Sequence, residues 1–346
     1  MRFASDNAGP VHPKVMEALA MANEGWALPY GNDGSTRQAV DKVRDVFDAP
    51  DAAVYFVATG SAANAILLGT MTAPFQTVFC TAQAHIHEDE CNAPEFYTGG
   101  AKLTLVASDD ARMSPQALET AITAQEGGNV HGPQPGPVSV TQVTERGTVY
   151  TLDQLGALAQ VAKAHELPVH LDGARFANAL VALGTTPADM TWRLGIDAVS
   201  FGGTKNGLMG VEAAVIFDPE KAWEFELRRK RGGHLFSKNR FLAAQMDAYL
   251  TDNLWLDMAE RANAAAAKLV AGFSDCPEVR LLHPSEANMI YVEMPRRLHR
   301  QLHEAGAVYY LQGTLEGADE ERLSARLVAD WSCPDGHIET FLKLCR

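Results

Sequence analysis

One lysine, Lys205, has a sequence environment suited to covalent chemistry. It follows a short apolar run within residues 197–210 and has glycines close by on both sides, Gly203 and Gly207 among them. Glycines let the backbone turn tightly and allow a bulky group to approach. A lysine held between a buried strand and small residues is a candidate for a lowered pKa and for Schiff-base formation. For this stretch alone, an ordinary lysine in a glycine-rich loop is the alternative.

A small-residue loop earlier in the chain is suited to binding phosphate. Residues 52–57 have the pattern of a buried strand, and Thr59, Gly60 and Ser61 follow it directly before an apolar helical segment. Free N–H groups and hydroxyls at the start of a helix form a favourable seat for a phosphate group. A tight turn with N-cap residues would have the same composition, so the loop by itself leaves both interpretations open.

An aspartate is placed where an α/β sheet binds its ligands. Asp172 comes directly after the apolar segment 168–171. A carboxylate buried there is costly unless it meets a cation. The pyridinium nitrogen of pyridoxal 5'-phosphate (PLP) would be such a cation, and its protonated ring is an electron sink. A helix N-cap is the alternative role for Asp172, and a surface salt bridge is the alternative for Arg175.

The elements that must position these residues alternate regularly between strand and helix patterns. The segments concerned are 77–80, 102–106, 114–123, 137–143, 152–165, 168–171 and 174–183. This alternation predicts an α/β fold with a mainly parallel sheet flanked by helices and with ligands at the carboxyl ends of the strands. In that fold the loop, the aspartate and the lysine would meet the phosphate, the ring nitrogen and the aldehyde of one PLP molecule.

The last third of the chain predicts a second, smaller unit. A long helical stretch over residues 236–273 precedes four strand-like segments that alternate with two short helices, and this is typical of a compact α+β domain. The strand-like segments are 279–282, 289–292, 308–311 and 324–329. We therefore expect residues 1–250 to form an amino-terminal segment and a large domain, and residues 251–346 a small one. The amino-terminal helix, over residues 13–22, is expected to pack with the small domain.

Composition excludes several classes of function. The formal net charge of -14 argues against nucleic acid or an anionic membrane surface as the main partner. The 5 cysteines are widely spread and form no C-x-x-C pair, so neither a disulfide framework nor a thiolate zinc site is indicated. No apolar run approaches the length of a membrane span, and the first residues lack the apolar core of a signal peptide. A cytoplasmic protein is expected.

Several stretches together resemble one family along nearly the whole chain, the low-specificity L-threonine aldolases. These are PLP enzymes of fold type I, which is the aspartate-aminotransferase fold, and the branch this chain resembles also accepts bulky β-hydroxy amino acids such as phenylserine. The matching stretches are residues 3–7, 30–33, 59–64, 84–90, 170–175 and 200–206.

The resemblance implies a role for each matching residue. Lys205 would hold PLP as a Schiff base, Asp172 would pair with the ring nitrogen, and the 59–61 loop would bind phosphate. His85 would stack on the ring and help to take the proton from the substrate hydroxyl. The residues implied near the cofactor phenol oxygen and the substrate carboxylate are Ser5, Arg175 and Arg326. Tyr30 and the basic cluster 229–231 would reach a neighbouring subunit's site, in a homodimer or homotetramer with shared active sites.

The chain departs from the family pattern at one place near the site. Many members carry a Thr-His-Asn stretch after the strand whose end in this chain reads as residues 141–147, so one histidine that could contact the substrate hydroxyl is absent. Gln142 or Glu145 is expected in that neighbourhood. The acids and histidines of residues 85–90 could also be read as metal ligands. Such loops are more often solvated or helix-capping, and we expect no metal site there.

The resulting expectation is a carbon-carbon lyase that splits L-threonine, L-allo-threonine or a related β-hydroxy-L-amino acid into glycine and an aldehyde. Two alternatives share the cofactor residues. One is another fold type I lyase that performs β-elimination, as tryptophanase does. The other is a PLP-fold protein without catalysis that serves in binding.

Overall fold

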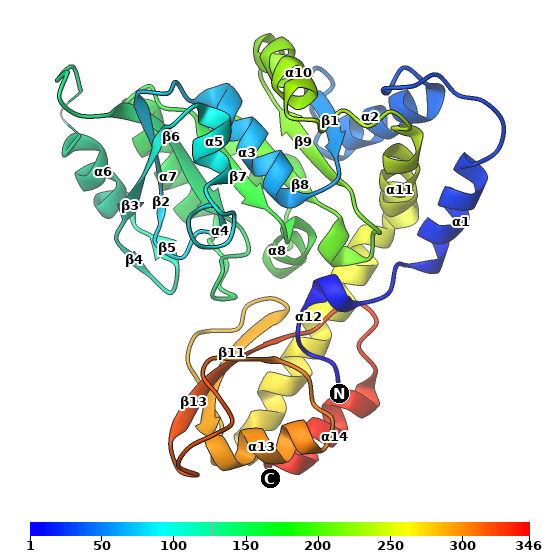
Figure 1. Ribbon diagram of the computed structural model, residues 1–346, viewed down its shortest axis with the longest axis vertical. Helices are drawn as coiled ribbons and strands as arrows, with labels where there is room; N and C mark the ends of the chain where they lie inside the picture. Colours follow the sequence, from blue (N-terminus) through cyan, green and yellow to red (C-terminus); the bar gives the residue numbers. More distant parts are fainter. Residues whose placement is uncertain (126) are drawn as a thin grey trace.

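A seven-stranded sheet forms the centre of the larger part of the molecule (Figure 1). The computed structural model describes residues 1–125 and 127–346. The strand order is β1-β9-β8-β7-β6-β2-β3, and β9 alone runs antiparallel to its neighbours. The strands are β1 (Ala53–Val57), β2 (Gln76–Thr81), β3 (Lys102–Val106), β6 (Gln134–Thr141), β7 (Val169–Gly173), β8 (Ala198–Gly202) and β9 (Glu212–Ile216). The predicted α/β fold with a mainly parallel sheet is confirmed.

Both faces of this sheet are buried, as its continuous apolar strands require. Alternate residues of β9 enter different cores: Ala214 and Ile216 pack under α3, whereas Ala213 and Val215 pack on the opposite face. The first face is covered by α3 (Gly60–Met71), α5 (Ala93–Thr98) and α10 (Ala222–Arg231). The helices that contribute to the core of the other face are α2 (Gly34–Val46), α6 (Pro115–Thr123), α7 (Leu152–Ala164), α8 (Phe176–Leu183) and α11 (Arg240–Leu250).

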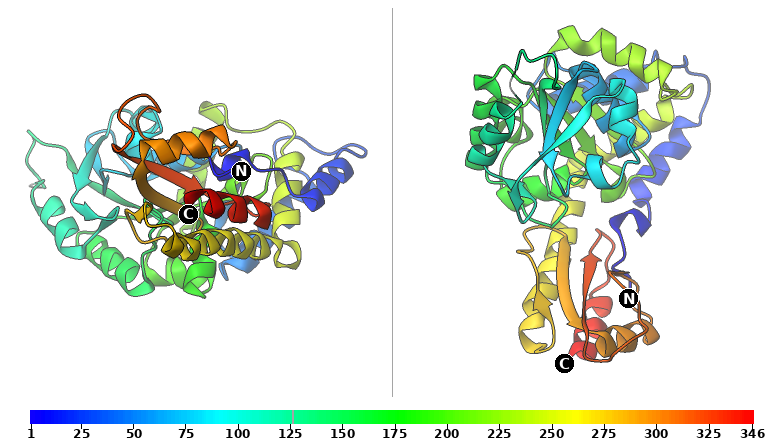
Figure 2. Two further views of the ribbon diagram at one scale, coloured as in Figure 1. Left: turned by 90° about the horizontal axis from the view of Figure 1, so that it is seen from below. Right: turned by 60° about the vertical axis from the view of Figure 1, so that its left-hand side comes forward.

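A separate antiparallel sheet forms the smaller part, seen below the large sheet in Figure 1. Its strands, in spatial order, are β10 (Arg280–Leu281), β11 (Met289–Pro295), β13 (Arg322–Val328) and β12 (Tyr310–Leu311). Helices α13 (Arg296–Glu304) and α14 (Asp335–Cys345) share its core. The first residues of the chain join this part, because Arg2 bridges Val308 and Phe3 is fully buried in the same core. Figure 2 shows both termini there.

One helix, α12 (Leu254–Gly272), contributes to both cores. Its first half buries Trp255 and Met258 against the large sheet, and its second half buries Ala266 and Leu269 in the core of the small sheet. The helix therefore links the two parts mechanically. The predicted division after residue 250 lies just before α12 and stays a prediction.

Two expectations about helices are wrong. The stretch 236–273 is not one helix, because Asp252 and Asn253 adopt φ of 54° and 56° between α11 and α12. Asn and Asp tolerate this left-handed conformation better than other residues do, so the break has a local cause. Helix α1 (Pro13–Ala22) packs on α11 rather than on the small sheet. Only the residues before it reach the small sheet.

The remaining short elements connect these layers. They include the helices α4 (His85–Glu88) and α9 (Pro187–Met190), the hairpin strands β4 (Ser108–Asp109) and β5 (Arg112–Met113), and the 3-10 turns η1 (Asp6–Ala8) and η3 (Thr204–Asn206). Within the described residues, no helix is both long and apolar enough to span a bilayer.

Strands β7 and β8 approach each other closely at their carboxyl ends, where Asp172 lies opposite Ser200. A Cβ added at Gly202 would lie 2.5 Å from the carbonyl oxygen of Ala174 and 2.7 Å from that of Gly173. Only glycine fits this position, because backbone atoms cannot move aside cheaply. The close approach places the turn after β7 beside the turn that carries Lys205.

Replacing Gly202 by alanine is expected to lower the free energy of unfolding by about 1–3 kcal/mol, because the added methyl group overpacks the junction of β7 and β8. Denaturant unfolding of the purified protein measures this. Gly336→Ala is the matched control, since a Cβ there meets nothing within 4 Å. Equal stability of the two variants would contradict the packing argument.

Candidate active site

A cavity of about 550 Å³ lies between the carboxyl edge of the large sheet and the small sheet. Its walls come from η1, from α4, from the turn after β7, from η3 and from strands β11 and β13. The predicted residues that line it together are Ser5, His85, Arg175, Lys205 and Arg326. Residues from five distant parts of the chain thus line one cavity, which is the arrangement that a ligand site needs.

Lys205 lies in η3, directly after the end of β8. Burial lowers the pKa of its amine, and the charge of Arg175 lowers it further, although Asp6, Asp172 and Glu212 oppose the shift. Among the described residues, its Nζ makes no hydrogen bond or ion pair. A partly buried amine that has no partner and a lowered pKa is well suited to act as a nucleophile.

Asp172 ends β7 and is only 2% exposed. Its Oδ1 accepts the backbone N–H of Ala174 at 3.0 Å, and its Oδ2 accepts the side-chain amide of Asn64 at 2.8 Å. Asn64 is the fifth residue of α3, about one turn beyond Ser61. The helix start is thus fastened beside Asp172. Thr59 is the N-cap of α3 and accepts the N–H of Ala62 at 3.2 Å.

His85 begins α4 and is held by two carboxylates. Its backbone N–H donates to Glu145 Oε1 at 2.8 Å, and its Nδ1 lies 2.8 Å from Glu90 Oε1. The bond to Glu90 raises the pKa of His85, burial opposes this, and the charge of Asp172 adds to the rise. Burial also raises the pKa of Glu145 to about 7. Two ionisable groups with raised pKa values, His85 and Glu145, therefore lie side by side at the cavity.

Three arginines line the cavity, Arg146, Arg175 and Arg326, and the two predicted ones differ in what already binds them. Arg175 makes a bidentate pair with Asp6, from its Nε at 2.7 Å and from a terminal nitrogen at 3.0 Å. Arg326 lies with its guanidinium 5.4 Å from the ring centre of Tyr310, and its Nε is buried without a hydrogen-bond partner among the described residues. Of the two predicted arginines, Arg326 is consequently the one with free donors for an incoming carboxylate.

Some predicted residues lie elsewhere. Gln142 is fully buried and exchanges two hydrogen bonds with the backbone of Tyr150, so of the two candidates for the neighbourhood of the missing histidine only Glu145 lines the cavity. Tyr30 lines a different cavity, together with Arg229, and does not line that of Lys205 within one chain.

The cluster 85–90 does not gather around one point. His87 bonds the carbonyl oxygen of Ala82, and Glu90 turns inward to His85 and Asn64. Among the described residues, no group of three His, Cys, Asp or Glu side chains is arranged to hold a metal ion.

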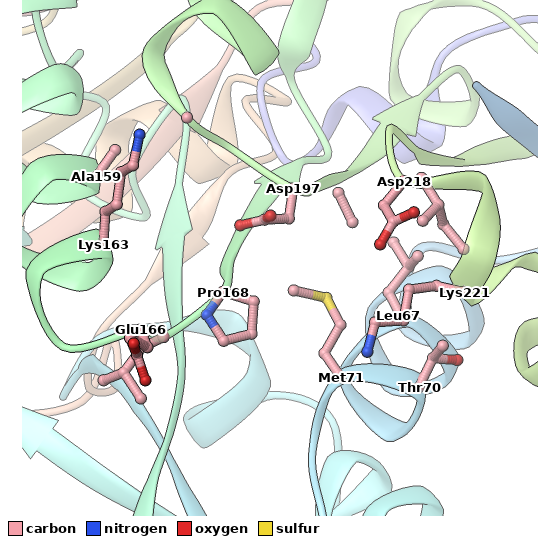
Figure 3. Close-up of a pocket in the computed structure, with 14 residues that line it drawn as sticks. Leu67, Thr70, Met71, Ala159, Lys163, Glu166, Pro168, Asp197, Asp218 and Lys221 are labelled. Atoms are coloured by element: carbon pink, nitrogen blue, oxygen red, sulfur yellow. The ribbon is translucent and has the colours of Figure 1, made fainter. Parts of the chain in front are cut away.

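A larger cavity, of about 640 Å³, lies at the opposite edge of the large sheet (Figure 3). It is lined by Pro168 and Asp197, which precede β7 and β8, and by the carboxyl end of α3. Figure 3 shows Asp197 and Asp218 directed toward its centre. None of the predicted site residues lines this cavity, so volume alone would have pointed to the wrong edge of the sheet.

Sequence reasoning missed the residues that support the site from below. Asp6, Asn64, Glu90 and Ser200 are all buried and all hydrogen-bonded to a predicted residue or to each other. A signal was available for two of them, because Asn64 and Ser200 interrupt otherwise apolar segments. A polar residue in such a position must find a partner inside the fold.

Comparison with known proteins agrees with this geometry. A family model described as beta-eliminating lyase matches residues 2–295. The low specificity L-threonine aldolase of Pseudomonas sp. (strain NCIMB 10558) is 38% identical over 97% of this chain and 94% of its own length, and that of Pseudomonas aeruginosa is 38% identical over 100% and 96%. The solved structure of Leishmania major threonine aldolase matches with a TM-score of 0.92 and 28% identity, over 99% of this chain and 98% of that one.

The chain belongs to the beta-eliminating lyase family, within its low specificity L-threonine aldolase group. Its fold is fold type I of the PLP-dependent enzymes, which the sequence resemblance implied.

Replacing Asp6 by asparagine is expected to lower the free energy of unfolding at neutral pH by about 3–5 kcal/mol, because the buried Arg175 loses its counter-charge. Burial alone would raise the pKa of Asp6, but Arg175, Lys205 and the hydrogen bonds outweigh it and hold that pKa below 3.8. The contribution of Asp6 is therefore complete above the unfolded pKa and is lost as pH falls through the folded pKa.

Urea unfolding at several pH values measures this difference. The gap between parent and variant should stay constant from neutral pH down to about pH 5 and should narrow only in stronger acid. Asp45→Asn, which changes an exposed carboxylate on α2, should show no such gap. A gap that closes near neutral pH would refute the assignment to Asp6.

Proposed function

We propose that this chain is a PLP-dependent aldolase that cleaves L-threonine, L-allo-threonine or related β-hydroxy-L-amino acids, phenylserine included, to glycine and an aldehyde. The proposal is carried by one cavity that three side chains share: Lys205, His85 and Arg326. Lys205 is partly buried and has no partner among the described residues, His85 is held by two carboxylates, and Arg326 has free donors. The full-length relatives at 38% identity support the same activity.

The residues of this chain fit PLP. Lys205 would bind the aldehyde, Asp172 the ring nitrogen, and Thr59, Gly60 and Ser61 the phosphate. A Cβ at Gly60 would enter open space, so the start of α3 is uncrowded, and the bond from Asn64 to Asp172 keeps that helix end beside the ring-nitrogen partner. When bound, PLP supplies a protonated ring that accepts the electrons of the Cα–Cβ bond.

Arg326 is suited to holding the substrate carboxylate, because its donors are free whereas Asp6 already accepts two hydrogen bonds from Arg175. Arg175 and Ser5 would then lie near the phenol oxygen of the cofactor. The charge of Arg175 also lowers the pKa of Lys205. A fixed carboxylate leaves the substrate one rotation about Cα. The orientation in which Arg326 would hold the substrate would decide which bond at Cα is cleaved.

Two proton transfers complete the reaction. His85 takes the proton of the β-hydroxyl as the carbonyl group of the aldehyde forms, which is general-base work suited to an imidazole. A proton is then delivered to Cα, so that glycine leaves and the reaction consumes no net proton. Glu145 holds His85 in place through its N–H. The lowered pKa of Lys205 keeps its amine available to displace glycine.

The assembly and the location are part of the proposal. We expect a homodimer or homotetramer in which Tyr30 and the basic cluster 229–231 reach a neighbouring site. Tyr30 is 44% exposed, and nearby Trp26 and Leu28 are exposed as well. Apolar side chains gathered on one surface are typical of a subunit contact. The protein is proposed to act in the cytoplasm.

The proposal is tested by incubating purified protein with L-threonine, L-allo-threonine and phenylserine and by assaying glycine and aldehyde together with the visible spectrum of bound PLP. Glycine and aldehyde in equal amounts are expected. Pyruvate and ammonia would instead indicate β-elimination, and a colourless protein that cannot be loaded with PLP would indicate a binding role. Lys205→Ala should lose both turnover and the covalent PLP signal.

Replacing Arg326 by alanine is expected to raise KM for L-threonine by about tenfold to a hundredfold, because a charge-assisted bidentate contact contributes about 1.5–3 kcal/mol. Steady-state kinetics measures this. Arg280→Ala removes an exposed arginine from the same small sheet and should leave KM unchanged. An unchanged KM in Arg326→Ala would shift the carboxylate contact to another residue.

A further inference from the structure

A continuous chain of hydrogen bonds runs beneath the active-site cavity. It joins three strands of the large sheet, β6, β7 and β8, to the amino-terminal half of α3 and the start of α4. Its members, in spatial order, are Ser139, His170, Ser200, Asn64, Glu90 and His85, with Asp172 as a branch from Asn64. All of them except His85 are at most 5% exposed.

The direction of these bonds follows from the two carboxylates. Asp172 Oδ2 and Glu90 Oε1 lie 2.8 Å and 2.9 Å from the same nitrogen, Asn64 Nδ2. Ionised carboxylates only accept, so the Asn64 amide must present both of its hydrogens to them. The carbonyl oxygen of Asn64 is then directed to Ser200, whose hydroxyl donates to it at 2.6 Å.

The other end of the chain agrees with this direction. Ser200 has only one hydrogen and gives it to Asn64, so it must accept from His170 Nε2 at 3.2 Å. Burial lowers the pKa of His170 to about 4, so the ring is neutral and its Nδ1 can accept from Ser139 at 3.0 Å. Each hydrogen in this series of hydrogen bonds can therefore be assigned to one donor atom.

The same logic determines the tautomer of His85. Glu90 Oε1 can only accept, so the hydrogen in its 2.8 Å contact belongs to His85 Nδ1. In the neutral ring, Nε2 is then the nitrogen that carries the lone pair. His85 lines the cavity that Lys205 also lines.

We propose that Asn64 and Glu90 are positioning residues that act together. The side-chain amide of Asn64 donates a hydrogen bond to Asp172 and another to Glu90, so that both carboxylates act as acceptors. Through Glu90, the same amide fixes the Nδ1–H tautomer of His85. The proposal rests on the proposed function for its kinetic consequences, but the tautomer is a property of the folded chain itself. Asn64 thus positions Asp172, the proposed partner of the cofactor ring, and, through Glu90, also His85, the proposed base for the substrate hydroxyl.

Several elements packed near His85 contribute charged groups that act on its ring. They are Glu90 after α4, Asp172 on β7, Lys205 in η3, Glu145 after β6, and Glu88 and Asp89, which line the same cavity. Of these, Glu90 makes the largest contribution to the raised pKa of His85. Removing its charge should therefore lower that pKa.

Nitrogen NMR of protein labelled with ¹⁵N-histidine tests the tautomer directly. The signals of His85 are identified by their absence in His85→Asn. Above the pKa of His85 we expect a protonated Nδ1 and an unprotonated Nε2. A neutral ring protonated at Nε2 would overturn the proposal, whether or not the protein proves to be an aldolase.

Glu90→Gln keeps the acceptor oxygen and removes the charge. The acidic limb of the kcat/KM profile should move to lower pH by about one unit, because the histidine loses its nearest negative charge. The affinity for PLP should change little. The matched control is Glu119→Gln, which removes the carboxylate that lies 3.0 Å from His165 on the surface and should move neither quantity. An unmoved acidic limb in Glu90→Gln would contradict the role of Glu90.

Asn64→Asp is nearly isosteric and removes both donors, so it tests the coupling. We expect PLP to bind at least about tenfold more weakly, since Asp172 loses a partner and gains a repulsive neighbour. Ser200→Ala, a milder change, should shift PLP affinity in the same direction and keeps the test decisive if Asn64→Asp does not fold. Equilibrium dialysis of PLP measures both. Unchanged affinity in the folded variants would refute the coupling.

Discussion

The carboxylate of Asp172 is buried at the end of a central strand, and much of the site depends on how that charge is satisfied. Its partners within the chain are one backbone N–H and one amide hydrogen of Asn64. Because the same amide nitrogen also serves Glu90, a shift of α3 relative to the sheet would cost each of two buried carboxylates one of its donors. The start of α3, the position of β7 and the ring of His85 are therefore held by one constraint.

The cavity also depends on the placement of the small sheet. Arg326 and Tyr291 belong to that sheet, whereas Lys205 and His85 come from the edge of the large one. Helix α12 packs into both cores, and the hydroxyl of Tyr291 donates to the carbonyl oxygen of Glu145 at 2.7 Å. These contacts fix the distance between the two sheets. A site whose residues come from both sheets depends on that distance.

Charges inside the site have more effect than those on the surface. Asp6, Arg175 and Lys205 are all enclosed, and each shifts the pKa of another. Away from water such interactions are screened weakly, whereas exposed pairs such as Lys268 with Asp335 contribute little. The same burial that makes the amine of Lys205 reactive makes the pair of Asp6 and Arg175 necessary, since Arg175 would otherwise be an uncompensated buried charge.

The sequence by itself determined the fold class, the family and the residues that lie at the ends of strands, because strand-helix alternation and loop composition are local properties. Lys205 and Asp172 were identified this way. The tertiary structure decided what depends on contacts between distant segments: that Asp6 occupies Arg175, that Arg326 is free, and that Gln142 turns inward while Glu145 lines the cavity. The tertiary structure also decided the break between α11 and α12 and the packing of α1 on α11. In each case the partner lies far away in the chain or the choice rests on packing, and no local pattern records either.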